Sequence, residues 1–410
     1  MPHSLFSAVP AAPPDPILSI TAAFRADPSP KKVNLGVGAY RTDDGLPYVL
    51  PIVRQYERHF ANDHSLNHEY LPQDGLTHFT VHSARLMFGK HSAPLNDNRV
   101  VTVQALSGTG ALRIGFAFIA TFLGQRLVYV PNPTWSNHRN VVPHAGLPPT
   151  RTYRYFDAAT CAVDIDGLLA DLKAAVPGSI VIFHGCAHNP TGADPSREQW
   201  KQILQVVKEA ALVPFFDNAY QGFASGDLDT DAWSTRLFAD SGIEMFVAQS
   251  YAKNMGMYGE RVGALNVVLS SSSSVDIVRG QLKRLIRATY SSPPLHGARI
   301  AAAIMSDEHA FRSWQTELRT MSERIRNMRT RLRDCLVANG APGNWDHIVK
   351  QIGMFSFTGL NAEQVRFIRS KYHVYMTLNG RISMAGLTEA TVQYVADAIC
   401  DAVKSIGRDA

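Results

Sequence analysis

Short apolar runs alternate with amphipathic stretches through the middle of the chain. Six apolar runs predict β-strands, at residues 100–105, 126–130, 180–184, 213–216, 245–249 and 264–268. Helices are predicted between them, for example over residues 109–123 and 196–211, and Ser196 with Gln199 gives the second a capping-box pattern. This alternation predicts an α/β fold with a mainly parallel sheet covered by helices on both faces.

The pattern changes after about residue 300. A long helix is predicted over residues 308–339, because apolar residues recur there every three or four positions and Gly340 follows. Short strands are predicted at 354–357 and 374–376, and a final helix from about Thr388. We expect this smaller region to pack with the N-terminal part of the chain. The Pro- and Ala-rich residues 5–16 predict an extended arm.

Composition narrows the class of protein. A chain of 410 residues exceeds one ordinary hydrophobic core, and 45% hydrophobic with 18% charged residues is typical of a globular protein. The four cysteines are scattered, which argues against a disulfide framework or a zinc ribbon and suits a reducing compartment. No apolar run is long enough for a membrane span, and we find no targeting signal, so we expect a cytoplasmic protein.

The net charge of +5 has a plain explanation. Many arginines lie between Arg312 and Arg333 on the predicted long helix, with Glu317 and Glu323 interspersed, as on a solvated helix face. We therefore expect neither a nucleic acid nor a membrane as partner. A mild positive bias suits an anionic small-molecule substrate.

One lysine lies in unusual surroundings just after the predicted strand 245–249. Lys253 has little acid nearby, so it can be desolvated and kept partly unprotonated, as an imine-forming amine requires. Ser250 and Arg261 flank it and could hold a phosphate through a hydroxyl and a guanidinium. An amine beside a phosphate clamp suggests a pyridoxal phosphate (PLP) Schiff base. A surface lysine with an unrelated arginine is the alternative.

Two further motifs follow predicted strands. The Ser107-Gly108-Thr109-Gly110 turn opens a helix whose free amides could bind a phosphate, although it could equally be a turn and cap. Asp217 ends a strongly apolar strand and could pair with a pyridine nitrogen, with Tyr220 near the 3-oxygen of the ring. A helix N-cap is the alternative for Asp217.

The remaining candidates are an amide, a tryptophan and two arginines. Asn189, in an Asn-Pro-Thr-Gly turn, could bond the same 3-oxygen, and Trp135 could stack on a planar ring or belong to the core. His184 and His188 raise the question of a metal, but we find no closed ligand set around them and expect none. Arg287 and Arg381 could each clamp a carboxylate or form surface salt bridges.

Taken together, the motifs resemble those of the aspartate aminotransferases, class I of the fold-type I PLP-dependent family. The resemblance runs from about Ser4 to Ile406. Besides the motifs above, it includes Asn34-Leu35-Gly36-Val37-Gly38-Ala39-Tyr40-Arg41, Asn67-His68-Glu69-Tyr70-Leu71-Pro72, Asp217-x-x-Tyr220-Gln221-Gly222-Phe223 and Gly353-Met354-Phe355-Ser356-Phe357. It implies a large seven-stranded sheet domain at 46–316, a small α+β domain from 14–45 and 317–410, and an N-terminal arm at 1–13.

The resemblance also implies residue roles. Lys253 would form the Schiff base and shuttle the proton, Asp217 would pair with the pyridine nitrogen with support from His138, and Trp135 would stack on the ring. The other cofactor contacts would be Tyr220, Asn189, Ser107, Gly108, Thr109, Ser250, Arg261 and, from the partner subunit, Tyr70. Substrate would meet Arg381 at its α-carboxylate, Arg287 from the partner at its distal carboxylate, and a lid containing Gly38, Ile17 and Leu18. A site shared in this way requires a homodimer, with the arm embracing the partner.

The implied reaction is a ping-pong amino transfer between L-aspartate and 2-oxoglutarate that gives oxaloacetate and L-glutamate. Ser292, Met255 and Met257 depart from residues common in the family and could loosen the pocket. A broad-range or aromatic transaminase is therefore the alternative. A PLP lyase fits less well, because a lyase has no use for a clamp on a distal carboxylate.

Overall fold

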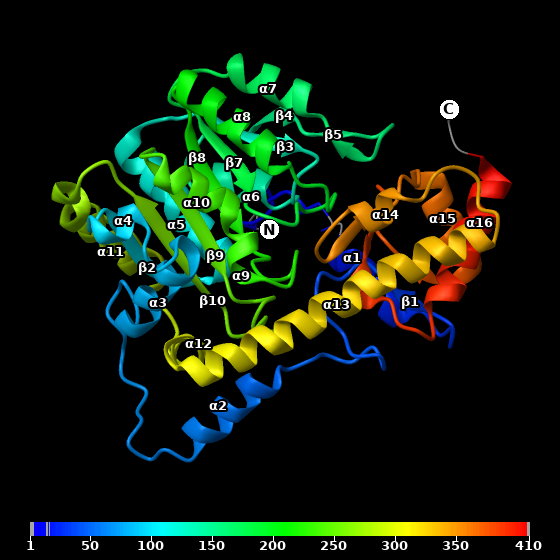
Figure 1. The fold of residues 1–410 in the computed structure, drawn as a ribbon, viewed down its shortest axis with the longest axis horizontal. Coiled ribbons are helices and arrows are strands. Elements are labelled where there is room, and N and C mark those ends of the chain that lie inside the picture. The colour runs from blue at the N-terminus through cyan, green and yellow to red at the C-terminus, as the bar shows by residue number, and fades with distance from the viewer. Residues whose placement is uncertain (1–3, 14, 16, 408–410) are drawn as a thin grey trace.

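A seven-stranded sheet forms the centre of the larger part of the molecule (Figure 1). The computed structural model describes residues 4–13, 15 and 17–407. The strand order is β2 (Val100–Leu106), β10 (Val262–Val268), β9 (Met245–Ser250), β8 (Val213–Asn218), β7 (Ile180–His184), β3 (Val128–Asn132) and β4 (Arg151–Arg154).

All strands of this sheet run parallel except β10, which is antiparallel to both of its neighbours. The carboxyl ends of β2, β9, β8, β7 and β3 therefore meet at one edge. The amino end of β10 lies at the same edge, because Val262 pairs with Leu106 at the end of β2. Side chains that follow these five strands therefore lie close to those that precede β10.

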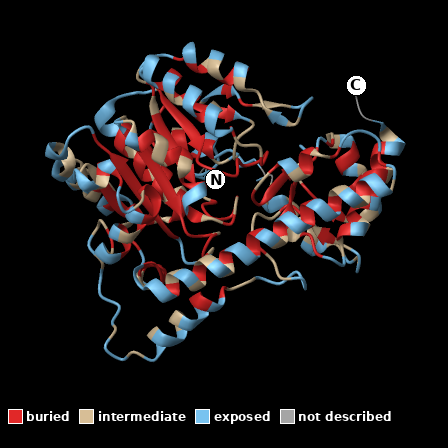
Figure 2. Ribbon diagram, in the orientation of Figure 1, coloured by how far each residue is buried: buried red, intermediate tan, exposed pale blue. Residues whose placement is uncertain are grey.

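Helices cover both faces of the sheet because its strands bury side chains on both sides (Figure 2). Ile180 and Ile182 of β7 belong to the core under α5 (Ser107–Phe118), α6 (His138–His144) and α11 (Val275–Tyr290). Val181 and Phe183 belong to the core on the other face, under α3 (Thr77–Phe88), α7 (Ile165–Lys173), α8 (Arg197–Glu209) and α10 (Trp233–Asp240). The capping box at Ser196 and Gln199 is present at the start of α8.

A second body, built from both ends of the chain, lies beside the first, and α13 (Glu308–Ala338) runs from one to the other (Figure 1). Its helices are α1 (Leu18–Ala26), α14 (His347–Lys350), α15 (Ala362–Tyr372) and α16 (Val392–Ile406), and its strands are β1 (Val33–Asn34), β11 (Phe355–Phe357), β12 (Val374–Tyr375) and β13 (Arg381–Ser383). Strand β1 pairs with β12, and β11 pairs with β13, so residues far apart in sequence are joined.

The remaining elements complete the fold, and most of them are short. They are α2 (Pro51–Ala61), α4 (Ala93–Asn96), the π-helix Ile119–Leu123, β5 (Phe156–Asp157), β6 (Ala162–Val163), α9 (Leu228–Asp231), the 3₁₀ helices Ser272–Ser274 and Met384–Gly386, and α12 (His296–Ser306). No helix in the described part of the chain is both long and apolar enough to cross a membrane.

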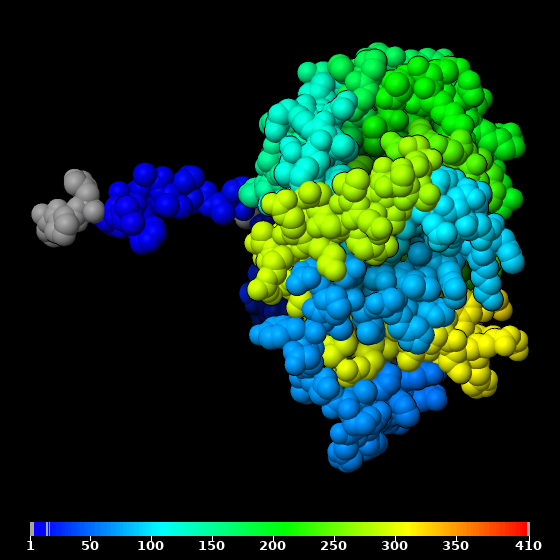
Figure 3. All heavy atoms as spheres, turned by 90° about the vertical axis from the view of Figure 1, so that its left-hand side faces the viewer, coloured from blue at the N-terminus to red at the C-terminus, as the bar shows by residue number. Residues whose placement is uncertain are grey.

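Several sequence predictions need correction. The strand predicted at 126–130 begins at Val128, the helix predicted from Thr109 begins at Ser107, and the final helix begins at Val392 rather than near Thr388. Thr388 and Thr391 bond each other through their hydroxyls instead, which holds a turn before the helix. The described residues of the predicted arm stand away from the body of the molecule (Figure 3), and those before Ser4 lie outside the described part. The domain limits stay a prediction.

Candidate active site

A cavity of about 280 Å³ lies at the edge where the strand ends meet. Its walls come from the loops after five strands, from the start of β10 and from the second body. The lining residues are Ile17, Gly38, Ser107, Gly108, Thr109, Trp135, His184, Asn189, Asp217, Ala219, Tyr220, Ser250, Ala252, Lys253, Tyr258, Arg261, Phe355 and Arg381. Most of the candidates predicted from the sequence therefore share one cavity.

Lys253 follows β9 and presents the amine of the cavity. Its Nζ lies 5.0 Å from the centre of the Tyr220 ring. Desolvation lowers the pKa of Lys253 and the nearby charge of Arg261 lowers it further, while Asp217 opposes the shift. A larger fraction of this amine is therefore uncharged at neutral pH than in an exposed lysine, and an uncharged amine is a nucleophile and a base.

One end of the cavity is built to bind an anion with several oxygens. Helix α5 begins at Ser107 and directs the free amides of its first turn into this end. The Ser107 and Ser250 hydroxyls lie 2.8 Å apart, and Arg261 is anchored by its Nη1, which donates to the Tyr258 carbonyl at 2.8 Å. Gly263 permits this arrangement, since a Cβ there would lie 2.6 Å from the Ser107 backbone.

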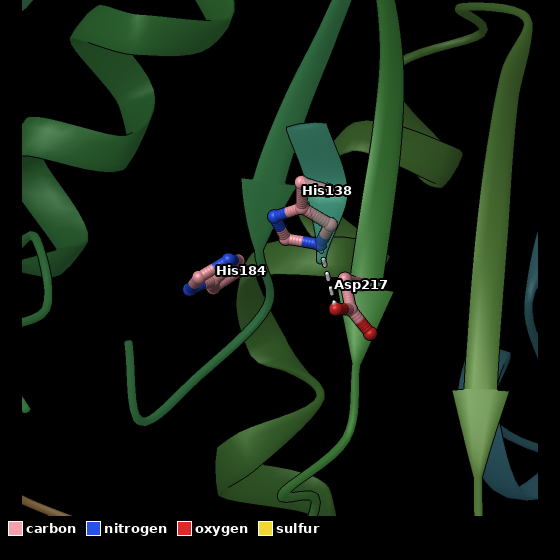
Figure 4. Close-up of side chains that lie close together, drawn as sticks. All are labelled: His138, His184 and Asp217. Carbon is pink, nitrogen blue, oxygen red and sulfur yellow. Dashed lines mark hydrogen bonds and ion pairs between the residues drawn. The ribbon is translucent and has the colours of Figure 1, made fainter. Parts of the chain in front are cut away.

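Asp217 is the penultimate residue of β8 and supplies a buried carboxylate to the same cavity (Figure 4). Its Oδ2 lies 3.1 Å from Nε2 of His138, and Nδ1 of His138 lies 2.8 Å from the Thr134 hydroxyl. Burial alone would raise the pKa of Asp217, but the hydrogen bond and the positive potential of His138 and Lys253 outweigh it and lower the pKa. Asp217 is therefore held as an anion.

His184 brings a third possible metal-binding group close to this pair (Figure 4). Ligand atoms of His138, His184 and Asp217 lie within 4.8 Å of one another, a proximity that the sequence spacing did not reveal. Hydrogen bonds account for the grouping: His138 is bonded to Asp217, and Nδ1 of His184 accepts from the Asn189 amide at 3.0 Å. Burial lowers the pKa of His184 to about 3, so its ring is neutral.

The cavity also contains an amide and a phenol, those of Asn189 and Tyr220. The Asn189 side-chain amide donates to the Tyr220 hydroxyl over 3.5 Å, and the bond from Asn189 to Pro190 is cis. Burial raises the pKa of Tyr220, which keeps the phenol protonated and able to donate. Trp135 lines the cavity and contacts the His138 ring edge-on, with ring centres 5.2 Å apart.

Arg381 is a buried cation that faces the cavity without a carboxylate partner among the described residues. Its Nη2 donates to the Gly36 carbonyl at 2.8 Å and its Nη1 to Oδ1 of Asn189 at 3.5 Å, while its Nε has no described partner. Burial lowers the pKa of Arg381 to about 10, which still leaves it charged at neutral pH. A buried guanidinium of this kind is suited to bind a carboxylate through two hydrogen bonds.

Four predicted site residues do not line this cavity. The Tyr70 side chain is mostly exposed, and Arg287, at the end of α11, is bonded to the Ser291 hydroxyl. Both were predicted to serve the site of a partner subunit. Leu18 is 69% exposed, whereas its neighbour Ile17 lines the cavity. His138 acts behind Asp217 and is not a lining residue.

Sequence reasoning gave no role to several residues that line the cavity, among them Tyr258 and Phe355. The Tyr258 hydroxyl accepts a hydrogen bond from the Tyr40 amide at 2.9 Å and so joins the Lys253 loop to the Gly38 segment. Phe355 lies against Arg381, with the guanidinium carbon 4.3 Å from the ring centre. Phe355 occurs inside the quoted motif at residues 353–357, and Tyr258 lies between Lys253 and Arg261, but an aromatic residue among apolar neighbours is typical of a core.

The donor set fits a flat aromatic cofactor that carries a phosphate. One end of the cavity offers helix amides, hydroxyls and Arg261, and Asp217 offers an anion elsewhere in it. Trp135 and Ala219 provide apolar surface, and Lys253 provides an amine. A Cβ at Gly108 would lie 3.4 Å from the Ser250 Cβ, so a side chain there would narrow the anion-binding end. PLP has the complementary phosphate, pyridine nitrogen and aldehyde.

Comparisons with known proteins agree with this geometry. The family model for aminotransferases of class I and II matches residues 30–399. The chain is 56% identical to aspartate aminotransferase 1 of Medicago sativa over 396 residues, which are 97% of this chain and 94% of that protein. The solved aspartate aminotransferase from Saccharomyces cerevisiae cytoplasm superposes with a TM-score of 0.95 and 45% identity over 98% of both chains. The aromatic-amino-acid aminotransferase of Burkholderia pseudomallei, covalently bound to pyridoxal phosphate, superposes with a TM-score of 0.94 and 43% identity, covering 98% of this chain and all of that one.

Proposed function

This chain belongs to the aminotransferase class I and II family, and from that premise we propose that it transfers the amino group of L-aspartate to 2-oxoglutarate. The products are oxaloacetate and L-glutamate. The observation that carries this proposal is the meeting of Lys253, Asp217 and the unpaired Arg381 in one cavity. The identity to an aspartate aminotransferase across nearly the whole chain supports the choice of donor.

We propose PLP as the cofactor and assign its contacts. Lys253 would hold its aldehyde carbon, Asp217 its pyridine nitrogen, and the start of α5 with Ser250 and Arg261 its phosphate. Tyr220 and Asn189 would bond its 3-oxygen, and Trp135 would cover one face of its ring. When bound, PLP supplies a conjugated ring that accepts the electron pair left on the α-carbon of the substrate.

The residues of the chain then perform the proton transfer and the binding. The uncharged Nζ of Lys253 accepts the proton that leaves the substrate α-carbon, since its lowered pKa suits a base at neutral pH. Asp217 remains an anion throughout because its pKa is lowered. Arg381 binds the α-carboxylate and so fixes which bond of the α-carbon faces Lys253.

We further propose that the active enzyme is a cytosolic homodimer. Arg287 and Tyr70 are absent from the lining of the cavity in their own chain, so each is free to complete the site of a second copy. Arg287 from the partner would bind the distal carboxylate of aspartate and 2-oxoglutarate. The likeness to the yeast cytoplasmic enzyme supports the location.

Product stoichiometry tests the proposed reaction. The purified, PLP-loaded protein is incubated with aspartate and 2-oxoglutarate, and oxaloacetate, glutamate, ammonia and carbon dioxide are measured. We expect one glutamate per oxaloacetate and no ammonia above background. Ammonia in proportion to turnover, or carbon dioxide released without glutamate, would identify a lyase instead.

A variant pair ties this reaction to Lys253. We expect Lys253→Ala to lower kcat by at least about 10³-fold, since both the amine and the base are lost. Lys201→Ala is the matched control, because Lys201 lies on the exposed face of α8 and pairs only with Glu198. Near wild-type turnover by the Lys253 variant would overturn the assignment.

A further inference from the structure

Arg329 is a buried cation that the proposed chemistry does not use. It lies on α13, is 2% exposed, and forms no ion pair with any described carboxylate. Burying an unpaired charge is costly, and burial lowers the pKa of Arg329 to about 9. The nearby Arg326 and Arg331 on the same helix are exposed, and Arg331 pairs with Glu389. The burial of Arg329 therefore needs an explanation other than a solvated helix face.

The guanidinium of Arg329 binds only backbone carbonyls. Nη1 donates to the Ile348 carbonyl at 2.9 Å, and Nη2 donates to the Gly353 carbonyl at 2.8 Å and to the Phe355 carbonyl. The fork of the guanidinium thus fixes both ends of the segment 348–355. A neutral side chain with one or two donors could not bind three carbonyls in this way.

This segment is pressed against the large sheet domain at the Asn189 loop. The Ile352 amide donates to the Gly192 carbonyl at 2.8 Å. Gly353 has a φ of +76°, and a Cβ there would lie 2.3 Å from the Cβ of Ala187. The close approach leaves no room for the segment to move toward the loop, and Arg329 prevents it from moving away.

The segment ends in Phe355, whose ring is packed between groups of the active site. The Arg381 guanidinium lies over the ring at 4.3 Å, and the Tyr220 ring contacts it edge-on with centres 6.1 Å apart. Gly38 also packs closely against the ring, since a Cβ at Gly38 would lie only 2.8 Å from Cζ of Phe355. A shift of the Phe355 backbone would therefore change the platform on which Arg381 rests.

From this chain of contacts we infer that Arg329 is a positioning residue for the α-carboxylate clamp. It holds the Gly353 and Phe355 carbonyls, so that the Phe355 ring keeps the Arg381 guanidinium aimed into the cavity. This inference rests on the proposed function, since it assigns Arg381 to the α-carboxylate. Because every amino acid has an α-carboxylate, loss of Arg329 weakens the binding of all amino donors by the same factor.

The test is a double-mutant cycle on the PLP-loaded enzyme. Arg329→Met, Phe355→Leu and the double variant are compared with wild type for KM and kcat with aspartate and with alanine, and for calorimetric binding of succinate. We expect Arg329→Met to raise KM about 30-fold for both donors and to weaken succinate similarly, with kcat changed less. The double variant should be no worse than the poorer single variant, because both act through one ring.

Two controls separate positioning from general destabilisation. Arg331→Met, two residues along α13, should leave KM and succinate binding within twofold of wild type. Arg329→Lys keeps a charge and part of the bonding, so it should recover part of the lost affinity even if the methionine variant folds poorly.

Specific outcomes contradict the inference. It fails if Arg329→Met and Arg329→Lys bind donors and succinate as wild type does, or if the effects of Arg329→Met and Phe355→Leu multiply. It also fails if KM rises for aspartate but not for alanine, because that pattern is expected from loss of the contact with the distal carboxylate, which alanine lacks. If wild type itself transfers no amino group, the proposed function has failed rather than the role of Arg329.

Discussion

At the scale of single residues, the site depends on charges that burial would otherwise oppose. Burial pushes the pKa of Asp217 upward, and the bond from His138 pulls it back below its ordinary value. The same low-dielectric surroundings lower the pKa of Lys253 and keep its amine reactive. One cavity thus contains a permanent anion and an amine that is easily deprotonated, and each state follows from named neighbours.

The bond between His138 and Asp217 gives a prediction about pH. In His138→Phe, the hydrogen bond and the positive potential are lost while burial remains, so the pKa of Asp217 rises. The anion is then lost as pH falls through a higher value than in wild type. A pH profile of kcat/KM for aspartate should therefore show its acid limb at a higher pH than in wild type.

The control for this profile is His144→Phe, which removes an exposed histidine bonded only to the Asn140 carbonyl. That variant should keep the wild-type profile. An unchanged acid side in His138→Phe would mean that His138 does not set the charge of Asp217.

Some of the residues that line the cavity could be recognised in the sequence and others could not, for a physical reason. Lys253, Asp217 and Ser250 were recognisable because a polar side chain directly after an apolar strand falls at the sheet edge. Phe355 and Tyr258 were not, because nothing local distinguishes an aromatic that faces a cavity from one in the core. The part played by Arg329 was hidden as well, since the sequence placed it among the solvated arginines of a long helix.

At the scale of elements, a buried carboxylate fixes the loop that follows Tyr220. Asp231, at the end of α9, accepts hydrogen bonds from the amides of Gly222, Ala224 and Ser225. None of the residues that the structure describes forms an ion pair with it, and burial raises its pKa to about 6 against an ordinary value of 3.8. Between these pH values the folded protein holds a proton that the unfolded chain has released.

This difference predicts how stability depends on pH. Since the folded state binds more protons, the contribution of Asp231 to the free energy of unfolding falls as pH rises from about 4 to 6. The fall is roughly 3 kcal/mol, from a shift of about two pKa units at 1.36 kcal/mol each. Asp231→Asn removes it, so the stability advantage of wild type over this variant should shrink over that range.

Denaturant unfolding at several pH values, at one protein concentration, measures this advantage. Asp229→Asn is the control, because that carboxylate is 75% exposed. An advantage that grows with rising pH would show that the bound amides, rather than burial, control the ionisation of Asp231.

The sequence located elements better than it located their ends or directions. Strand β7 was predicted to the residue, since its four apolar positions, 180–183, lie between Ser179 and His184. The antiparallel direction of β10 was not predicted, because hydrophobic pattern carries no information on strand direction. Helix α11 and the edge strand β4 were also not predicted, and β4 exposes three of its four side chains and so lacks an apolar run.

At the scale of the whole molecule, the positions of Arg287, Tyr70 and the N-terminal arm are those that the proposed homodimer requires. Arg287 and Tyr70 lie outside the cavity of their own chain. Leu5, Phe6 and Val9 are 88%, 73% and 68% exposed on an arm that leaves the body (Figure 3). Apolar side chains on a projecting arm favour contact with a second copy.

Subunit exchange tests the shared site. In a mixture of Lys253→Ala and Arg287→Ala subunits, each hybrid dimer has one site with both residues intact and one with neither. Random exchange makes half of the dimers hybrids, so aspartate turnover should recover to about a quarter of the wild-type value.

Each variant incubated alone gives the baseline for this recovery. Mixtures that stay at that baseline, after exchange is verified by mass, would mean that Lys253 and Arg287 of one site come from the same chain.

The central claim is that two arginines select a dicarboxylic amino donor, and one comparison tests it most directly. This is kcat/KM for aspartate and for phenylalanine, each with 2-oxoglutarate, in wild type and in Arg287→Ala. We predict that wild type prefers aspartate by about 10²-fold or more, and that the variant loses this preference mainly through aspartate. Comparable values for both donors in wild type, or equal losses in the variant, would contradict the claim and identify a broad-range transaminase.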